Sequence, residues 1–331
     1  MYDVSVAGKT NPPRANLVSV IVPVFNDERF IEGCLSSLRA QAGVNCEVLI
    51  VLDTGSVDNT SKVVGPWSEV AGFRLISTLH CTIGHALNIG LKNAKGNVIA
   101  FAEADKVFDS SWLRNAVDYL DEHQDVLGVG SLAVPPETTS FAGQCFKEMK
   151  EINQRRLQDV RDIEWGYVYR REILEKIGGW NEKLLVAEDR DLAKRVIRAG
   201  GKIHLVRKAD NVHHLSGIYE GLLPLLRKQY STGTKHAINH VRSFTSGWMV
   251  SGMTVLGAIA LVAGLLVPTL LVPGLLLIAS EYTFRLLKFA YLGRGTASAR
   301  IFCFPLLATA MNLAYAGGLF TGMLPSRKNL R

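Results

Sequence analysis

Short apolar runs and amphipathic stretches alternate along the first third of the chain. Residues Leu17–Val24 and 47–52 are continuous apolar runs rich in β-branched residues, typical of strands buried on both faces. Two further strands are predicted at 73–77 and 97–101. Between the first two runs, residues 31–38 carry apolar side chains at helical spacing. This succession of strand, helix and strand predicts βαβ units and a mostly parallel sheet.

Polar and acidic residues follow three of the predicted strands directly. They are residues 23–28, Asp53 and residues 103–105. In parallel sheets, ligands bind beyond the carboxyl ends of the strands. The pattern alone therefore predicts a ligand site at that edge of the sheet.

Residues 188–199 predict a later helix with three acidic residues in its first turn. Glu188, Asp189 and Asp191 lie near the positive end of the helix dipole, which favours their ionised forms. Spacing leaves two interpretations open: the acids only stabilise the first turn, or they belong to a site.

From residue 247 onward the chain becomes largely apolar, which accounts for an overall hydrophobic content of 48%. Residues 247–267, 269–291 and 301–324 are each long enough to cross a bilayer. The second candidate carries three charges on one helical face, namely Glu281, Arg285 and Lys288. Three crossings would put the basic tail outside the cell, against the positive-inside trend. Three spans and two spans with an in-plane helix therefore both stay open, and three membrane helices are favoured.

We therefore expect five regions. They are a polar tail at 1–16, a catalytic domain at 17–215, an amphipathic interfacial segment at 216–245, a transmembrane region of two or three helices at 246–325, and a basic tail at 326–331.

The net charge of +7 points to a membrane surface rather than to nucleic acid, because many basic residues flank the apolar region. The five cysteines have no CxxC spacing, which favours a reducing compartment. The N-terminus lacks the apolar core of a signal peptide. We expect a multi-pass protein of the cytoplasmic membrane with its catalytic domain in the cytosol.

Five motifs occur in a set order: VSVIVPVFNDE, VLDTGSVDNT, ALNIGLKNAKGNVIAFAEAD, GGWNEKLLVAEDRDLAKRVIRAGG and RKQYSTG. Together they closely resemble family 2 glycosyltransferases of the membrane-bound exopolysaccharide or succinoglycan type, over roughly residues 17–235. The resemblance implies an α/β GT-A fold, which is a Rossmann-like nucleotide-binding sheet with helices on both faces, followed here by C-terminal membrane helices. It also implies a nucleotide-sugar donor of the UDP, GDP or dTDP type.

The resemblance assigns donor-binding roles to residues of the first three motifs. Pro23, Val24 and Phe25 match the segment that holds the nucleotide base, although a strand-end aromatic such as Phe25 also suits a core position. Glu28 matches an acid near the ribose and base, and Asp53 matches the aspartate that contacts the base.

Residues 103–105 match the DxD motif of the family, in which carboxylates hold Mg²⁺ or Mn²⁺ against the donor diphosphate. Asp105 matches the usual metal ligand, whereas Glu103 departs from the usual aspartate and puts the choice of metal in doubt. His214 lies where some relatives place a histidine on the metal, and a structural role suits it equally well.

Asp189 matches the general base of the ED motif of the family, with Glu188 positioning the site. One base without an enzyme nucleophile implies a single displacement that inverts the anomeric centre. Gly179 and Trp180 match a segment near the acceptor, although core packing is the usual role of a tryptophan.

The resemblance thus implies a metal-dependent, inverting transfer of a sugar to a hydroxyl of a lipid-linked or oligosaccharide acceptor at the cytoplasmic membrane face, with membrane lipid as a further partner. Two alternatives remain. A polyprenyl-phosphate sugar synthase of the dolichol-phosphate-mannose type would need no general base, and a non-catalytic membrane scaffold would keep the fold without turnover.

Overall fold

We describe the protein from a computed structural model of the 331-residue chain. The described residues are 17–79, 81–154, 160–162, 166–206, 212–214, 217–238, 256–257, 259–293 and 298–323, with the backbone alone for 160–162 and 212–214. The polar and basic tails expected at 1–16 and 326–331 lie outside these residues.

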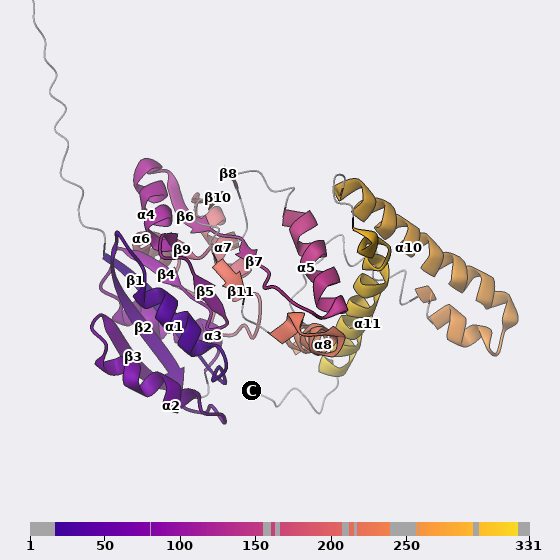
Figure 1. The fold of residues 1–331 in the computed structure, drawn as a ribbon, viewed down its shortest axis with the longest axis horizontal. Helices are drawn as coiled ribbons and strands as arrows, with labels where there is room; N and C mark the ends of the chain where they lie inside the picture. Colours follow the sequence, from indigo (N-terminus) through magenta and orange to yellow (C-terminus); the bar gives the residue numbers. More distant parts are fainter. Residues whose placement is uncertain are drawn as a thin grey trace, which may run out of the picture.

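Eight strands form the main sheet, in the order β3-β2-β1-β4-β9-β6-β10-β8 (Figure 1). They are β1 (Leu17–Val24), β2 (Asn45–Asp53), β3 (Phe73–Thr78), β4 (Val98–Phe101), β6 (Val126–Gly130), β8 (Val160–Asp162), β9 (Val168–Arg170) and β10 (Lys202–Val206). β1 pairs in parallel with β2 and β4, and β2 pairs in parallel with β3, so the βαβ prediction is confirmed. The sheet is nevertheless mixed, because β9 runs antiparallel between β4 and β6, and β8 runs antiparallel to β10.

Helices cover both faces of this sheet (Figure 1), as expected for the fold. One face carries α1 (Ile31–Arg39), α2 (Thr60–Val64), the short helix η1 (Gly65–Glu69) and α4 (Trp112–Glu122). The other carries α3 (Ile83–Asn93), α6 (Arg171–Lys176) and α7 (Glu188–Arg198). Alternate residues of β1 enter the two cores, with Val20 in the first and Ile21 in the second, and both are fully buried. This burial on both faces explains the unbroken apolar runs of the sequence.

A small second sheet joins β5 (Lys106–Phe108), β11 (Val212–His214) and β7 (Ala133–Val134), in the order β5-β11-β7. β11 runs antiparallel to β5, with His214 opposite Lys106. The backbone of His214 is therefore paired one residue beyond Asp105.

Six helices contribute to a third core beside the main sheet (Figure 1). They are α5 (Phe141–Gln154), η3 (Gly217–Tyr219), α8 (Leu222–Ile238), α10 (Leu271–Leu292), η5 (Ala299–Phe302) and α11 (Phe304–Gly322). The short helix η4 (Pro268–Leu270) directly precedes α10 and contributes no residue to this core. Phe146, Tyr219, Leu225, Phe289 and Phe304 meet in this core. α8 thus packs within the protein as well as lying between the sheet and the apolar helices.

Within the described part of the chain, Pro268–Leu292 is the one helix long and apolar enough to cross a membrane. Only 11% of its most apolar 18-residue stretch is buried inside the protein. Two of its charged residues form an ion pair with each other: Arg285 Nε donates to Glu281 Oε1 at 2.7 Å. Glu281 is only 2% exposed, so this pair lies where the helix packs against the rest of the protein. The other two predicted spans differ: the first part of 247–267, up to residue 255, lies outside the described residues, as does 258, and 301–324 contains α11, which packs along α8.

Candidate active site

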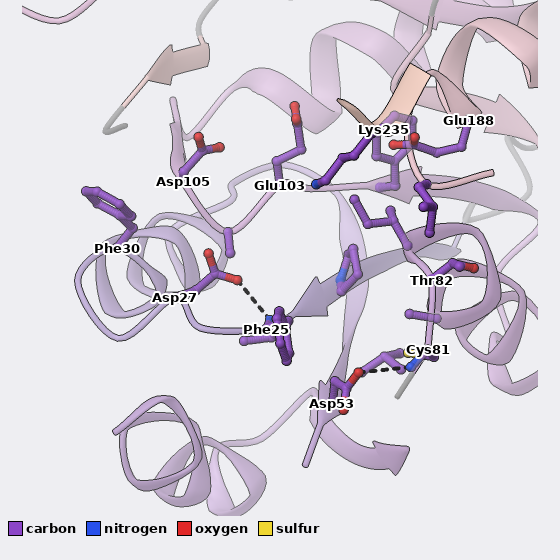
Figure 2. A pocket seen from close by; sticks show the side chains of 18 of the residues that line it. Phe25, Asp27, Phe30, Asp53, Cys81, Thr82, Glu103, Asp105, Glu188 and Lys235 are labelled. Atoms are coloured by element: carbon purple, nitrogen blue, oxygen red, sulfur yellow. Dashed lines mark hydrogen bonds between the residues drawn. The ribbon is translucent and has the colours of Figure 1, made fainter. Parts of the chain in front are cut away.

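A cavity of about 480 Å³ opens at the carboxyl ends of β1, β2 and β4 (Figure 2). Its position matches the ligand site predicted from the strand ends. Seven of the site residues named from the sequence line it: Pro23, Val24, Phe25, Asp53, Glu103, Asp105 and Glu188.

The loop after β1 turns sharply at Asn26, which has a left-handed φ of 54°. Asparagine tolerates this conformation better than most residues, and here its Oδ1 accepts a hydrogen bond from Val57 N at 2.8 Å. The turn leaves Phe25 at the cavity rim, where it is 51% exposed. The ring is therefore outside the core and accessible to a ligand.

The same turn directs Asp27 rather than Glu28 toward the cavity. Asp27 Oδ2 accepts from Phe25 N at 3.0 Å (Figure 2). Glu28 is not among the lining residues, because its Oε2 accepts from the backbone and side-chain nitrogens of Asn59 at 2.7 and 3.0 Å. In this structure Glu28 ties the loop to the start of α2.

Asp53 ends β2 and is held in the cavity wall by two loops. Its Oδ1 accepts from Gly55 N at 2.8 Å, and its Oδ2 accepts from Cys81 N at 3.0 Å (Figure 2). These bonds connect the turn after β2 to the segment that leads into α3. Asp53 therefore sets the shape of this wall as well as its charge.

Glu103 forms an ion pair with Lys106, three residues further along the chain. Tyr167 Oη donates to Glu103 Oε2 at 3.1 Å, and Lys106 Nζ donates to Tyr167 Oη at 2.7 Å. Lys106 is 3% exposed, and burial, reinforced by the charge of Lys150, lowers its pKa to about 7. The carboxylate of Glu103 is thus partly offset by a neighbouring cation.

Asp105 and Asp27 face the cavity from neighbouring loops (Figure 2). Burial raises the pKa of both carboxyls, that of Asp27 to about 6, and the charge of Asp105 contributes to the shift of Asp27. Such a pair of carboxylates offers the hard oxygen ligands that Mg²⁺ and Mn²⁺ prefer.

The carboxylates of the cavity fit a divalent cation only if a bound ligand supplies the remaining coordinating oxygens. The described residues contain no cluster of three or more metal-ligating side chains. Magnesium often binds through one or two carboxylates together with water and substrate phosphates. Asp105 suits that arrangement, whereas Glu103 is occupied by Lys106. The side chain of His214 lies outside the described residues.

α7 begins directly after a second left-handed residue, Ala187, with φ of 63°. For alanine this backbone is strained, and strain of this kind often accompanies functional loops. It places Glu188 in the cavity wall, where burial raises the pKa of its carboxyl. Asp189 does not line the cavity, and its Oδ1 accepts a hydrogen bond from Arg190 N at 2.7 Å. Its negative charge nevertheless acts to raise the pKa of Lys106. Asp191 pairs with Arg195 at 2.8 Å along the helix.

Asn88 of α3 holds the Gly179–Trp180 segment through two hydrogen bonds to the backbone of Trp180. Asn88 Oδ1 accepts from Trp180 N at 2.8 Å, and Asn88 Nδ2 donates to Trp180 O at 2.9 Å. Gly179 has φ of 69°, and a Cβ there would lie 2.3 Å from Asn88 Oδ1. Trp180 is 2% exposed and packs edge-on against Phe101, so its indole belongs to the core instead of lining the cavity.

Several cavity residues were not among the site residues predicted from the sequence, and they include Asp27, Thr82, Lys228 and Lys235. Asp27 lies within the FNDE motif and Lys228 within RKQYSTG, so the motifs held a signal for both. Lys235 follows Lys228 by seven residues on α8. The sequence predicts an amphipathic interfacial segment there, and within it RKQYSTG resembles a family stretch near the donor phosphates or the acceptor entrance.

The chain is similar to several known proteins in sequence and in fold. The profile described as Glycosyl transferase family 2 matches residues 19–178. The uncharacterized glycosyltransferase EpsJ of Bacillus subtilis (strain 168) is 28% identical over 203 residues, covering 57% of this chain and 58% of that protein. The poly(ribitol-phosphate) beta-N-acetylglucosaminyltransferase TarS of Staphylococcus aureus (strain Mu50) is 26% identical over 213 residues, covering 61% of this chain and 36% of TarS.

Among solved structures, the mannosyltransferase PcManGT of Pyrobaculum calidifontis, in complex with GDP-Man and Mn²⁺, has a similar fold. The TM-score is 0.59 at 21% identity, covering 94% of this chain and 88% of PcManGT. This likeness confirms the GT-A fold predicted from the motifs.

Proposed function

We propose that this chain, whose residues 19–178 match the model of glycosyltransferase family 2, transfers a sugar from a nucleotide-sugar donor to an acceptor hydroxyl, with inversion and with a divalent cation. The observation that carries this proposal is the cavity at the strand ends, where Asp53, Asp105 and Glu188 come together from separate elements. The donor class also agrees with PcManGT, whose structure contains GDP-Man.

The donor binds with its nucleotide between Phe25 and Asp53. Phe25 presents an exposed ring on which a base can stack. The loops around Asp53 are already fixed by its two backbone hydrogen bonds, so this wall is preorganised for binding. The diphosphate then lies toward Asp105.

A cation held by Asp105 would neutralise charge on the departing diphosphate. Because Lys106 offsets the charge of Glu103, we expect Asp105 to be the principal protein ligand. PcManGT contains Mn²⁺, and the residues here leave the choice between Mn²⁺ and Mg²⁺ to experiment.

Asp189 is the general base in this proposal. Its carboxylate accepts the proton of the acceptor hydroxyl while the hydroxyl oxygen bonds to the anomeric carbon. The bond from that carbon to the phosphate oxygen breaks, and the nucleoside diphosphate leaves with the electron pair. A single displacement of this kind inverts the anomeric centre. Glu188, in the cavity wall, orients the acceptor beside the base.

The acceptor is a lipid-linked glycan at the cytoplasmic membrane face in this proposal, and the C-terminal helices anchor the chain in that membrane. The apolar helix Pro268–Leu292, which is mostly unburied, supports such an anchor. An acceptor confined to the bilayer meets an anchored enzyme more often than a free one, which gives the anchor a purpose.

The test is turnover by the full chain purified in detergent. UDP-, GDP- and dTDP-sugars are supplied with a bacterial lipid extract, with and without Mn²⁺ or Mg²⁺, and label is followed into lipid-extractable product. Asp189→Asn is compared with Asp191→Asn, the same change two residues away at a carboxylate paired with Arg195. We expect one donor to be consumed, and only Asp189→Asn to slow transfer strongly, by roughly 10²–10⁴-fold.

Retained transfer in Asp189→Asn would instead indicate an acceptor that is already ionised, as in a polyprenyl-phosphate sugar synthase. Binding of nucleoside diphosphate without consumption of any donor would indicate a non-catalytic scaffold.

A further inference from the structure

Glu182 lies in the segment that joins Trp180 to α7, and both of its carboxylate oxygens contact α3. His85 Nδ1 lies 2.8 Å from Glu182 Oε2, and Asn88 Nδ2 donates to Glu182 Oε1 at 2.8 Å. Thr82, the N-cap residue of α3, donates through Oγ1 to the carbonyl oxygen of Glu182 at 2.7 Å. Residues spaced by three share one face of a helix, so a single face of α3 holds Glu182 at three points.

The backbone on either side of this contact is also fixed. A Cβ at Gly84 of α3 would lie 2.8 Å from the carbonyl oxygen of Asn181, which is a close approach between the helix and the segment. From the other direction, Arg195 Nη1 of α7 donates to the carbonyl oxygen of Gly179 at 2.6 Å. The start of the segment is thus held between α3 and α7.

The far end of the segment carries the acids at the start of α7. Residues 183–187 lead from Glu182 to Ala187, whose left-handed φ of 63° directly precedes Glu188 and Asp189. A residue other than glycine keeps such a backbone only where the surrounding structure imposes it. Contacts that fix Glu182 therefore help to set the direction in which the first turn of α7 leaves the segment.

The same end of α3 forms part of the cavity. Cys81, Thr82 and Ile83 line it, and Figure 2 shows the side chains of Cys81 and Thr82 in its wall. Thr82 is thus a cavity residue and a partner of Glu182 at once. Through it, the segment that ends at α7 is held against the wall that the proposed donor would touch.

We propose that Glu182 is a positioning residue, which holds residues 183–189 against α3 and thereby keeps Asp189 within reach of the acceptor hydroxyl. The role of Asp189 as the base rests on the proposed function. Glu182 itself does not line the cavity, so it acts through the segment. Hydrogen bonds from Asn88 and then from His85 lower the pKa of its carboxyl, which keeps both oxygens available as acceptors at neutral pH.

The contact is too exposed to contribute much to global stability. The side chains of His85 and Glu182 are 43% and 48% exposed, and ion pairs of this kind contribute little to the free energy of unfolding. A variant that loses the contact should therefore fold. Its defect should be local to the segment.

Three variants separate positioning from a general loss of charge. Glu182→Ala removes both side-chain contacts, whereas Glu182→Gln can accept from Asn88 through its amide oxygen and donate to His85 Nδ1 through its amide nitrogen. Glu175→Ala is the matched control, because Glu175 is also exposed and also pairs with a neighbour, Arg171, at 2.7 Å.

The first measurement is sugar transfer and UDP or GDP binding by the full chain in detergent. We expect Glu182→Ala to lower kcat by roughly 10–10²-fold, the cost of a small misplacement of a reacting group, with nucleotide affinity and Tm close to wild type. Glu182→Gln should stay within about threefold of wild type and Glu175→Ala within about twofold. A normal kcat in Glu182→Ala, an equal loss in Glu182→Gln, or a parallel loss of nucleotide affinity and Tm would overturn the positioning role.

The second measurement is hydrogen exchange of the backbone amides, which needs no turnover. We expect residues 183–189 to exchange faster in Glu182→Ala than in wild type or in Glu175→Ala, because a segment released from α3 opens more often. Unchanged exchange in this segment would overturn the inference.

Failure of this inference is separable from failure of the proposed function. If wild type consumes no donor, the proposed function fails, and the exchange rates still decide whether Glu182 holds the segment. If wild type transfers sugar and Glu182→Ala transfers it equally well, the positioning role alone fails.

Discussion

Glu47 offers a test of how the part of the sheet that carries the site is held together. It lies on β2, and its Oε1 accepts from Ser19 Oγ of β1 and from Lys95 N, each at 2.7 Å. Its Oε2 accepts from Arg74 Nη1 of β3 at 3.3 Å. One buried carboxylate therefore connects β1, β2, β3 and the turn before β4. We predict that Glu47→Gln destabilises the protein.

The magnitude follows from these contacts. Glutamine can keep the bonds from Ser19 and Lys95 through its carbonyl oxygen, but both lose their charge assistance, at a cost of roughly 0.5–1 kcal/mol each. The contact with Arg74 is lost, and because Arg74 is partly exposed this adds at most about 1 kcal/mol. The sum is about 2 kcal/mol, equivalent to a fall in Tm of roughly 4–8 °C for a domain of this size.

The difference depends on pH. Burial acts to raise the pKa of Glu47, but hydrogen bonds from Ser19, Lys95 and Arg74 outweigh it and hold the pKa below its ordinary value of 4.5. A depressed pKa in the folded state contributes stability that is present above the unfolded value and is lost as the pH falls through the folded value. The Glu47→Gln deficit is therefore complete at pH 7 and shrinks as the pH falls below 4.5.

Thermal unfolding of the detergent-solubilised chain, followed by tryptophan fluorescence from pH 7 downward, measures the effect. Glu69→Gln is the matched control, because Glu69 is an exposed carboxylate and its change should stay within about 0.5 kcal/mol. Equal Tm values for the two variants at pH 7 would refute the reasoning. A deficit that does not diminish on acidification would refute the linkage argument.

Three further predictions concern the site. Asp189→Asn should lower kcat by roughly 10²–10⁴-fold, the usual contribution of a general base, and leave nucleoside diphosphate affinity unchanged; a parallel loss of affinity would contradict a role limited to proton transfer. Gly179→Ala should lower the Tm more than Gly178→Ala, because both residues have left-handed backbones but only the new Cβ at 179 would clash with Asn88. Equal Tm values for the two variants would contradict the close contact between Gly179 and Asn88. Chelation of divalent cations should abolish transfer, with recovery on adding Mn²⁺ or Mg²⁺, whereas undiminished transfer in chelator would exclude metal dependence.

The apolar pattern of the sequence was sufficient to predict β1 and β2, the strands whose ends carry the proposed nucleotide-binding residues. β1 and β2 are central strands, so both faces must be apolar, and that requirement is visible in each run without knowledge of its partners. Asp53 and Asp105 follow such strands, and the parallel pairing brings the strand ends to one edge. Their meeting in one cavity was therefore predictable from local pattern alone.

Side-chain direction in loops was not predictable in this way. The left-handed turn at Asn26 sends Asp27 into the cavity and leaves Glu28 bonded to Asn59. Phe25 and Trp180 were each open to a core or a ligand-facing position; Phe25 is exposed at the rim, and Trp180 is buried against Phe101. Those outcomes depend on contacts between residues far apart in the sequence.

The order of the strands along the chain, the acids at the strand ends, the helix that begins with Glu188 and the apolar C-terminal region were all predictable from local pattern, because each depends on neighbours along the chain. The antiparallel entry of the short strand β9 into the main sheet was not, since three residues are too few to show a period. The same holds for the approach of Lys228 and Lys235 to the cavity, because it depends on the packing of α8 against α11, some 80 residues away along the chain.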